Sequence, residues 1–425
     1  MFDKIPSPSP QLVKKFYFLD YFLILLQSCK NNNDFPKVFQ NFKYLKNKLR
    51  LGESKYRRLV IDNEDLSENQ VRRYIYTFEQ VIIEAVRYGL VKNTGTQLSL
   101  TKMGKECLHV GESNKGAFYQ KMLFLMEEKY SAFFHLVKLC YDQNKVNNGL
   151  LIFPIYSPRK LGFEKKEMIT NGDWINFSKK LRRRLEVDIE KYLGKRESLK
   201  DANDQLLSKL IEDNLLKSEK AKFIDQRKYN LILGRFRRYW LNYFLKHLYD
   251  YPFSFDTFNI WVERGKQLGI VHSTEFYPNF DGRLVFPTSI IVKKNRNDDF
   301  SEVFIYPNDE KLYIHKPSWE IINNQESFID ALVDSYFDIK RKRRTHFIRL
   351  SDLRERVCYK IRIPSFVFNE FLQRTYNNSL KGLTRVQISL EADRLPYETN
   401  AMYLKREPVL VNEVYKNIIA IDYKK

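Results

Sequence analysis

Four polar side chains recur on one predicted helix near the C-terminus, and their chemistry suits the edges of nucleic-acid bases. Ser365, Asn369 and Gln373 follow one another in steps of four residues, with Arg374 beside them. Asn and Gln can make paired hydrogen bonds to adenine, and Arg to guanine, in the major groove of duplex DNA. The alternative is the solvated face of an amphipathic helix, which Glu370 on the same face favours. The first interpretation predicts a helix that reads bases.

A run of five basic residues, Lys340-Arg341-Lys342-Arg343-Arg344, precedes this stretch. Such a run can be a solvated linker, a clamp for phosphate groups or, less readily, a localisation signal. If the neighbouring stretch binds DNA, the run supplies cations for the phosphate backbone. Lys340, Arg341, Arg343 and Arg344 are therefore candidate DNA-binding residues.

Two further basic clusters lie in the middle of the chain, on predicted helices where Arg alternates with apolar residues. The candidate contacts are Lys179, Lys180, Arg182, Arg183, Arg184, Arg235, Arg237 and Arg238. A pair of such helices can line a positive groove for a duplex backbone. The alternative is the outer face of a helical connector. The density of Arg against a Lys-rich background favours contact, because guanidinium groups suit phosphate.

The sequence contains no familiar catalytic or metal-binding motif. A phosphate-binding glycine loop, a nucleophile elbow and a paired-histidine zinc motif are all missing. Its four cysteines are far apart and lack the spacing of a zinc site. We therefore predict no catalytic residue, no metal and no cofactor, and a non-enzymatic role. A nuclease with an unrecognised site stays open as a weaker alternative.

Composition points to a protein that meets a polyanion. The chain has 425 residues, of which 43% are hydrophobic and 29% charged, and its formal net charge is +21. This charge favours DNA as partner, although an A+T-biased genome would also enrich Lys. The apolar run from Phe16 to Leu26 is too short to span a bilayer. The N-terminus does not resemble a signal peptide, so we expect no membrane role and a cytoplasmic location.

The elements that must position the C-terminal candidates follow from periodicity and from turn residues. A helix is expected from Leu350, and a second one from Pro364, with Val367, Phe368, Phe371, Leu372 and Tyr376 on its apolar face. After Gly382 the pattern alternates over Val386, Ile388 and Leu390, as in a half-buried strand, and another apolar run covers 418–421. This order of helix, turn, helix and hairpin resembles the winged helix-turn-helix proteins. The resemblance implies DNA binding through the second helix.

A similar order precedes it near the N-terminus. The predicted helix starts after Ser67 and ends at Tyr88-Gly89, and its expected buried face contains Val71, Ile75, Phe78, Ile82 and Ala85 or Val86. A short hairpin at 90–101 and a Leu-Thr-x-x-Gly sequence follow. Residues 55–110 thereby resemble the second half of bacterial winged-helix repressors. Arg72 and Arg73 on the helix and Lys92 on the hairpin become candidate DNA contacts, with a subunit interface as the alternative.

Residues 255–286 repeat this architecture, with a helix that ends near Leu268-Gly269 and a hairpin after it. The predicted fold class is α+β, mainly α-helical, with several winged-helix modules joined by helical segments. We expect an N-terminal region with a winged helix at 1–110, a basic helical middle at 111–250, a second winged-helix-like module at 251–300, and at 301–425 a hairpin, a basic linker and a C-terminal winged helix.

The function predicted from this organisation is non-enzymatic binding of double-stranded DNA. Several winged helices in one basic chain resemble plasmid replication initiators and also DNA-sensing subunits of prokaryotic antiviral defence systems, which implies a subunit of a larger complex. The alternative is an interaction scaffold that uses its winged helices to bind other protein subunits. The sequence leaves this choice open.

Overall fold

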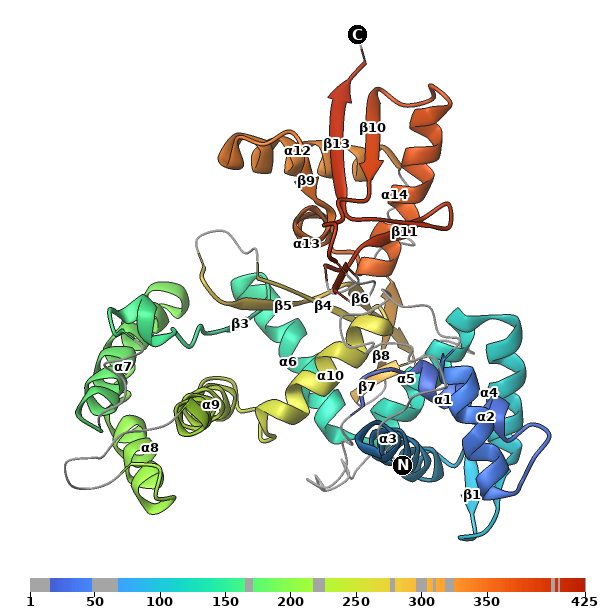
Figure 1. Cartoon of the computed structure of the whole chain (residues 1–425), viewed down its shortest axis with the longest axis horizontal. Coiled ribbons are helices and arrows are strands. Elements are labelled where there is room, and N and C mark those ends of the chain that lie inside the picture. The colour runs from blue at the N-terminus through green and yellow to red at the C-terminus, as the bar shows by residue number, and fades with distance from the viewer. Residues whose placement is uncertain are drawn as a thin grey trace. The chain divides into compact units, whose positions relative to one another are not determined.

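The fold of this chain is α+β and mainly helical, with several small sheets (Figure 1). A computed structural model describes residues 16–47, 68–164, 171–216, 226–275, 280–295, 304–308, 311–317, 325–398, 402–403 and 406–424. Within these ranges, no helix is both long and apolar enough to cross a membrane. The predicted fold class is confirmed at this coarse level.

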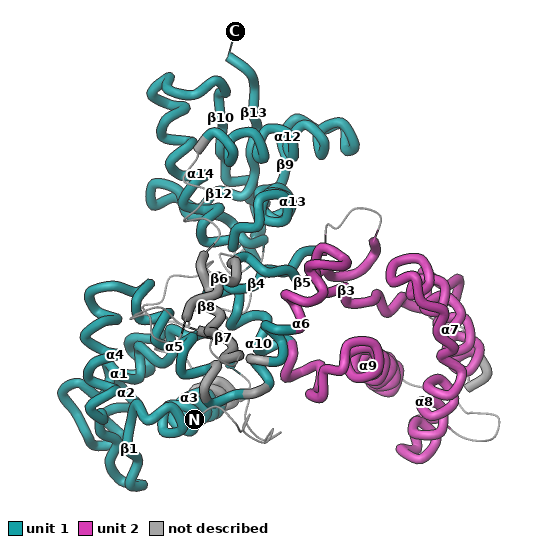
Figure 2. Tube along the Cα trace, turned by 180° about the vertical axis from the view of Figure 1, so that it is seen from behind, with its two compact units in different colours: residues 1–138, 259–274, 286–425 teal, residues 139–258, 275–285 magenta. Residues whose placement is uncertain are grey.

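Contacts between Cα atoms divide the chain into two compact units (Figure 2). Unit 1 comprises residues 1–138, 259–274 and 286–425, and unit 2 comprises residues 139–258 and 275–285. This division has only two units and does not test the four regions expected from the sequence. Those four regions stay a prediction.

The N-terminal part of unit 1 consists of helices and one two-stranded sheet. Its elements are α1 (Asp20–Ser28), α2 (Phe35–Asn47), α3 (Glu68–Arg87), β1 (Val91–Asn93), β2 (Leu98–Leu100), α4 (Lys102–Ser113) and α5 (Lys115–Lys129), followed by α6 (Ser131–Asn147), which continues into unit 2. β1 and β2 pair antiparallel, as the predicted hairpin requires. An isolated antiparallel bridge joins Asp34, between α1 and α2, to Gln97.

The Leu-Thr-x-x-Gly sequence has a clear structural cause. The hydroxyl of Thr101 caps α4 by accepting a hydrogen bond of 2.9 Å from the backbone N–H of Gly104. A Cβ atom at Gly104 would lie 2.0 Å from the carbonyl oxygen of Leu90, so no larger residue fits there. The motif therefore lets the start of α4 pack directly against the start of the hairpin.

Unit 2 is built around three helices. Its elements are β3 (Leu150–Ile152), η1 (Pro158–Leu161), α7 (Asn171–Leu193), α8 (Lys200–Glu212), α9 (Gln226–Tyr243) and the π-helical turn η3 (Phe244–Leu248). Phe177, Leu181, Leu185 and Ile189, expected on the inward face of α7, are fully buried. Tyr192, expected on the same face, is only partly buried. Trp174 of α7 stacks on Phe236 of α9, with 5.6 Å between ring centroids, which holds the two helices together.

In the sequence, one helix and several strands separate α9 and η3 from the C-terminal region. They are α10 (Phe255–Gln267), β4 (Val271–Thr274), β5 (Arg283–Pro287), β6 (Ser289–Asn295), β7 (Phe304–Asn308) and β8 (Lys311–Pro317). The helix and strands expected at 255–286 are present. The hairpin expected at 301–315 is confirmed, because β7 pairs antiparallel with β8 in a sheet of order β6-β8-β7.

The C-terminal region has a core of its own, formed by buried apolar residues between 328 and 421. Its elements are α12 (Gln325–Arg343), β9 (Ile348–Arg349), α13 (Leu350–Ile361), α14 (Ser365–Leu380), β10 (Val386–Glu391), β11 (Val409–Val411), β12 (Val414–Lys416) and β13 (Ile418–Tyr423). Antiparallel pairing gives a three-stranded sheet of order β10-β13-β9, with the three helices around it (Figure 1). β10 alternates buried and exposed residues as predicted.

Three helices end in the same way. Gly89, Gly269 and Gly382 have φ angles of +69°, +71° and +78°, a left-handed conformation in which Gly avoids the steric cost of a Cβ atom. The residue after each Gly donates its N–H to a carbonyl five positions earlier, as in Leu90 to Ala85, Ile270 to Gly265 and Leu383 to Asn378. A strand starts within four residues of each Gly. The similar sequences at these three helix ends therefore reflect one shared backbone conformation.

Two expectations are wrong. The basic run expected as a linker is helical, because Lys340 to Arg343 form the last turn of α12. Cations are favoured there by the negative end of the helix dipole. Ile75 of α3, expected in the core, has an exposed fraction of 40%. Phe78, Ile82 and Ala85 of the same predicted face are buried as expected.

Candidate nucleic-acid interface

α14 offers part of the polar face that its sequence predicts. Gln373 and Arg374 are exposed, while Phe368 and Leu372 are fully buried in the C-terminal core. Arg374 Nη2 lies 3.1 Å from Glu370 Oε1, one turn earlier on the helix. Both side chains are more than half exposed, so water screens this ion pair and leaves the guanidinium available to a stronger anion.

Ser365 and Asn369 are less accessible than predicted. Both are only partly exposed, and Asn369 Oδ1 is buried without a hydrogen-bond partner among the described residues. An amide oxygen in this situation costs free energy until it finds a donor. Gln373 and Arg374 are therefore exposed together, whereas Ser365 and Asn369 are only partly accessible.

A hairpin within the long loop after β10 reaches the same helix. β11 and β12 pair antiparallel, and Asn412 and Glu413 at their turn have φ angles of +47° and +66°. Asn412 Nδ2 donates a hydrogen bond of 2.9 Å to Asn377 Oδ1 of α14. This hairpin was not predicted. Its signal in the sequence is an Asn between two short apolar runs, since Asn tolerates the positive φ angles of a tight turn.

The basic run at the end of α12 is largely paired with acidic residues. Asp338 Oδ1 lies 3.2 Å from Arg341, and Asp338 Oδ2 lies 3.1 Å from Lys342 and also contacts Arg356. Although burial acts in the opposite direction, hydrogen bonds from these three cations lower the pKa of Asp338. One carboxylate thus holds three cations, which leaves a positive excess at this helix end.

The remaining members of the run differ in their surroundings. Arg343 contacts Asp352 of α13. Lys340 Nζ lies 3.2 Å from His346 Nδ1 and 5.6 Å from the ring centroid of Tyr336. Arg344 is exposed and has no acidic partner among the described residues. Arg344 is accordingly the residue of this run that is most available to phosphate.

The basic residues of α7 fall into two groups. Arg182 Nη1 lies 3.0 Å from Glu186, and Arg184 Nε lies 3.4 Å from Asp188, so each has an acid one turn later. Lys180 is exposed, with Nζ 5.6 Å from the ring centroid of Phe163. The other group consists of Lys179 and Arg183. Both are exposed, and neither has an ion-pair partner in the described part of the chain.

Lys179 and Arg183 are one helical turn apart and therefore project from the same face of α7. On α9, Arg235 and Arg238 lie 3.7 Å and 3.6 Å from Asp213 and Asp256, at the outer limit of an ion pair. Arg237 is exposed and has no acidic partner within the described ranges. These three unpaired cations are the residues of unit 2 best suited to bind phosphate.

The N-terminal candidates are less strongly marked. Arg72 of α3 and Lys92 of β1 are exposed, whereas the side chain of Arg73 lies outside the described residues. The exposed side of α3 is mainly apolar: it carries Ile75, Tyr76, Ile83 and Val86, with exposed fractions between 40% and 45%. An apolar helix face suits a protein surface better than a phosphate backbone.

No family model matches this chain, and neither a curated protein nor a solved structure is significantly similar to it. The physical properties of the described residues therefore carry the functional argument. Among those residues, no three His, Cys, Asp or Glu side chains come together in a way that could hold a metal ion.

Two buried charged pairs hold elements of unit 1 together, and the sequence analysis missed both. Arg264 of α10 makes two hydrogen bonds, of 2.8 Å and 3.1 Å, to the carboxylate of Glu84 of α3. Both side chains are completely buried. The guanidinium also donates to the carbonyl of Phe16 and lies 4.9 Å from the ring centroid of Trp261. This pair anchors the rear of α3.

The second pair joins β4 to α13. His272 Nε2 lies 3.3 Å from Glu355 Oε2, and the imidazole is completely buried. Burial lowers the pKa of His272, against the opposing attraction of Glu355. Burial also disfavours the charged form of Glu355, but the attraction of the His272 ring, at acidic pH where that ring is protonated, outweighs this and lowers the pKa of Glu355 to about 2. At neutral pH the lowered pKa of His272 leaves a neutral imidazole beside an ionised carboxylate.

Proposed function

We propose that this protein binds double-stranded DNA through winged-helix modules, and that the C-terminal one reads bases with α14. The observation that carries the proposal is the element order α12-β9-α13-α14-β10-β13, with the β11–β12 hairpin inserted before β13, together with the strand order β10-β13-β9. A winged helix-turn-helix has three helices and one strand ahead of its hairpin, and that strand pairs with the last strand of the hairpin. In that fold the third helix enters the major groove. Gln373 and Arg374 are the exposed residues of α14 with base-pairing chemistry.

The N-terminal elements support a second module of the same kind. Their order is α1, a bridging residue at Asp34, α2, α3, β1 and β2. The bridge of Asp34 to Gln97, next to β2, corresponds to the pairing of β9 with β13. The order of elements and the position of the extra pairing thus agree in two stretches of one chain.

Charge supports duplex DNA as the ligand. The net charge of +21 is distributed over several clusters, and Lys179, Arg183, Arg237 and Arg344 are exposed without an acidic partner among the described residues. Cations of this kind bind phosphates and release counterions, which strengthens binding to any sequence. We assign base reading to α14 and phosphate binding to these four residues.

The experiment is a salt titration of the full-length protein with a fluorescent 30-base-pair duplex. The logarithm of the association constant should fall linearly with the logarithm of salt concentration, with a slope of about −0.9 for each phosphate neutralised. Changing Lys179, Arg183 and Arg237 together to Ala should reduce the slope by roughly one per cation, for all sequences alike. Duplex binding that is undetectable at low salt would refute the proposal.

A matched control removes three other cations of unit 2, each of which has an acidic partner. Lys145, Lys160 and Arg196 pair with acids at 3.9 Å, 2.5 Å and 2.6 Å. Changing them to Ala lowers the net charge by the same amount. The salt slope of this variant should stay close to that of the unchanged protein. If the salt slope fell equally in both variants, only net charge would matter, and Lys179, Arg183 and Arg237 would not form a binding surface.

A second candidate function is favoured by the exposed apolar face of α3. Ile75, Tyr76, Ile83 and Val86 form a stripe that suits another protein subunit. In this alternative the N-terminal module is a scaffold for a partner. Its test is the solution mass of the chain, alone and with co-expressed neighbouring gene products, before and after Tyr76→Ser and Ile83→Ser. A complex that forms equally well with both changes would exclude this face.

A further inference from the structure

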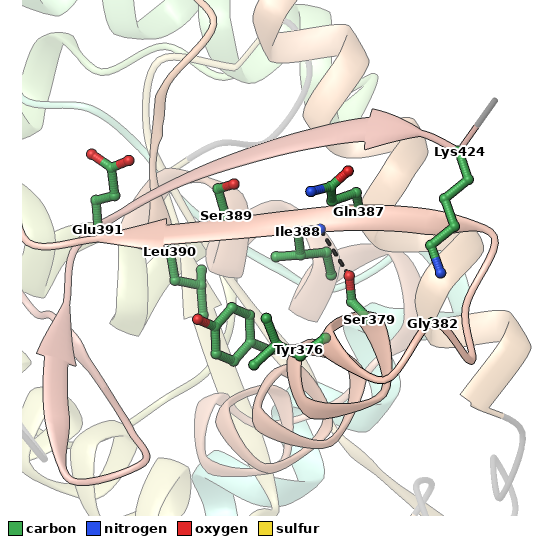
Figure 3. A pocket seen from close by; sticks show the side chains of 10 residues that line it. Tyr376, Ser379, Gly382, Gln387, Ile388, Ser389, Leu390, Glu391 and Lys424 are labelled. Atoms are coloured by element: carbon green, nitrogen blue, oxygen red, sulfur yellow. Dashed lines mark hydrogen bonds between the residues drawn. The ribbon is translucent and has the colours of Figure 1, made fainter.

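The free edge of β10 borders a groove whose lining includes neither Gln373 nor Arg374. β10 is an outer strand of its sheet, and α14 runs beside it (Figure 3). The groove encloses about 520 Å³ and is lined by Tyr376, Ser379 and Leu380 of α14 and by residues 387–391 of β10. A helix beside an open strand edge has the geometry that accepts an extended peptide as an added strand.

The register shows which backbone groups of β10 face this groove. Arg385 and Lys424 form a hydrogen-bonded pair, through the N–H of Lys424 and the carbonyl of Arg385, 3.2 Å apart. Hydrogen-bonded and non-hydrogen-bonded pairs alternate along an antiparallel ladder. The N–H and C=O groups of Val386, Ile388 and Leu390 therefore point away from β13 and towards the free edge.

α14 satisfies the first part of this edge but not the second. Ser379 Oγ accepts a hydrogen bond of 2.9 Å from the N–H of Ile388 (Figure 3). The same hydroxyl donates one of 3.1 Å to the carbonyl of Val386. The N–H and C=O of Leu390 have no hydrogen-bond partner among the described residues. An added strand would satisfy them, since a buried backbone group needs a partner. Leu390 is thus the point at which a peptide would first pair.

Opposite charges mark the two ends of the groove. Lys424 lies at the end where β10 begins and Glu391 lies where it ends (Figure 3). Both are exposed, and neither has an ion-pair partner in the described part of the chain. Lys424 pairs with Arg385, one position before β10, so the two charges are six positions apart along the strand, or about 20 Å. A peptide that matches these charges has a cation and a carboxylate six positions apart.

We propose that this groove binds an extended segment of a partner protein, which adds antiparallel to β10 with a basic residue at Glu391 and an acidic residue at Lys424. Antiparallel pairing is slightly more stable per residue than parallel pairing. It also sets the order of charges in the segment, because the basic residue then precedes the acidic one. Gln373 and Arg374 do not line the groove, so peptide binding and duplex binding can be tested with variants of different residues.

The test uses two synthetic probes with the same composition, both labelled at the N-terminus and amidated at the C-terminus. One is Lys-Val-Thr-Val-Thr-Val-Glu and the other is Glu-Val-Thr-Val-Thr-Val-Lys. Fluorescence anisotropy with the full-length protein at low salt should give at least a fivefold preference for the first probe, the factor expected for one exposed ion pair of about 1 kcal/mol. Equal binding of the two probes, or no binding of either, would overturn the proposal.

A charge-swapped protein provides the matched control. Glu391→Lys combined with Lys424→Glu changes two exposed side chains and leaves the net charge unchanged. The preference should reverse, so that the second probe binds at least fivefold more tightly. A preference that persists after the swap would mean that the peptide binds elsewhere.

Strand addition has a further readout at Leu390. In protein labelled with 15N-leucine, the amide of Leu390 should exchange more slowly with solvent when the first probe is bound. Charge-dependent binding without this protection would show that the peptide does not pair with β10. Duplex affinity of the same charge-swapped variant, measured separately, distinguishes this surface from the proposed DNA interface.

Discussion

α3 and α14 hold equivalent places in two stretches with the same order of elements, yet they present different side chains to solvent. Each ends at a left-handed Gly, Gly89 or Gly382, and each leads into an antiparallel hairpin. The exposed side of α3 is an apolar stripe, whereas the middle of α14 exposes Gln373 and Arg374. Backbone order is shared between them, and the chemistry offered to a partner is not.

The two helices also differ in the contacts that fix their buried sides. α3 is anchored by the completely buried pair of Glu84 and Arg264. α14 packs on apolar residues such as Phe368 and Leu372, and its neighbour α13 meets β4 through His272 and Glu355. The first anchor contains a guanidinium that stays charged at any physiological pH, and the second contains an imidazole that can titrate. The comparison therefore teaches that one backbone arrangement can serve a fixed module and a pH-sensitive one.

The largest expected effect comes from breaking the anchor of α3. Arg264→Met leaves the carboxylate of Glu84 buried without its cation, which should lower the free energy of unfolding of unit 1 by about 3–5 kcal/mol. Urea denaturation followed by Trp fluorescence measures this change, because Trp261 lies against the guanidinium.

The control combines Arg264→Met with Glu84→Leu, which replaces the whole pair by apolar side chains. Such replacements are often neutral or stabilising, so the double variant should recover most of the loss. If Arg264→Met alone unfolded at the same urea concentration as the unchanged protein, the pair would not anchor α3.

The next effect separates the two exposed faces. Changing Gln373 and Arg374 to Ala should cost about 1–3 kcal/mol of discrimination between a selected duplex and a scrambled one. Tyr76→Ala and Ile83→Ala on α3 should leave that discrimination unchanged. Competition binding on duplexes selected from a random library by the unchanged protein measures both. A loss of selectivity in the α3 variant would reverse the assignment of the two faces.

The C-terminal elements show how far local sequence patterns could predict this fold. Pro364 precedes α14 and Gly382 follows its end, and the alternation after Gly382 gave β10 correctly. β9 was missed because it is two residues long and exists only through pairing with β13, about 70 positions later. The end of α12 was missed because a basic run has the same composition in a linker and in a last helical turn.

Candidate surface residues were harder to predict than helices. Spacing placed Asn369 beside Gln373, but the partial burial of Asn369 depends on tertiary packing around α14. Spacing also placed Ile75 in the core, whereas packing leaves Ile75 exposed and buries Glu84. The partner of Glu84 is 180 positions away, at a distance that local periodicity does not address.

A smaller effect, the change in stability with pH, tests the difference between the Glu84–Arg264 pair and the His272–Glu355 pair. The pKa of His272 in the folded protein is lowered from its unfolded value of about 6.5, so the unfolded state binds a proton more readily. Stability should therefore fall as pH decreases below about 6.5. The pKa of Glu355, at about 2, lies below this range, so Glu355 stays ionised in the folded state.

Urea denaturation at pH 7.0 and at pH 5.5 measures this loss. The matched control is His272→Gln, whose amide can still donate to Glu355 but cannot titrate. The difference in stability between the two pH values should shrink in this variant. The same shrinkage in Arg264→Met and none in His272→Gln would assign the pH dependence to the other anchor.

The smallest expected effect asks which helix lies on DNA, using one neutralised carboxylate on each. Glu370 of α14 and Glu79 of α3 are both exposed, and Glu370 lies 3.1 Å from Arg374. Glu370→Gln removes a charge that repels phosphate and frees the Arg374 guanidinium, so duplex affinity should rise roughly twofold to fivefold at low salt. Glu79→Gln changes the net charge equally but should leave affinity nearly unchanged. If both variants gained equally, the gain would come from net charge, and α14 would lose its special place; if only Glu79→Gln gained, α3 would be the helix that approaches the duplex.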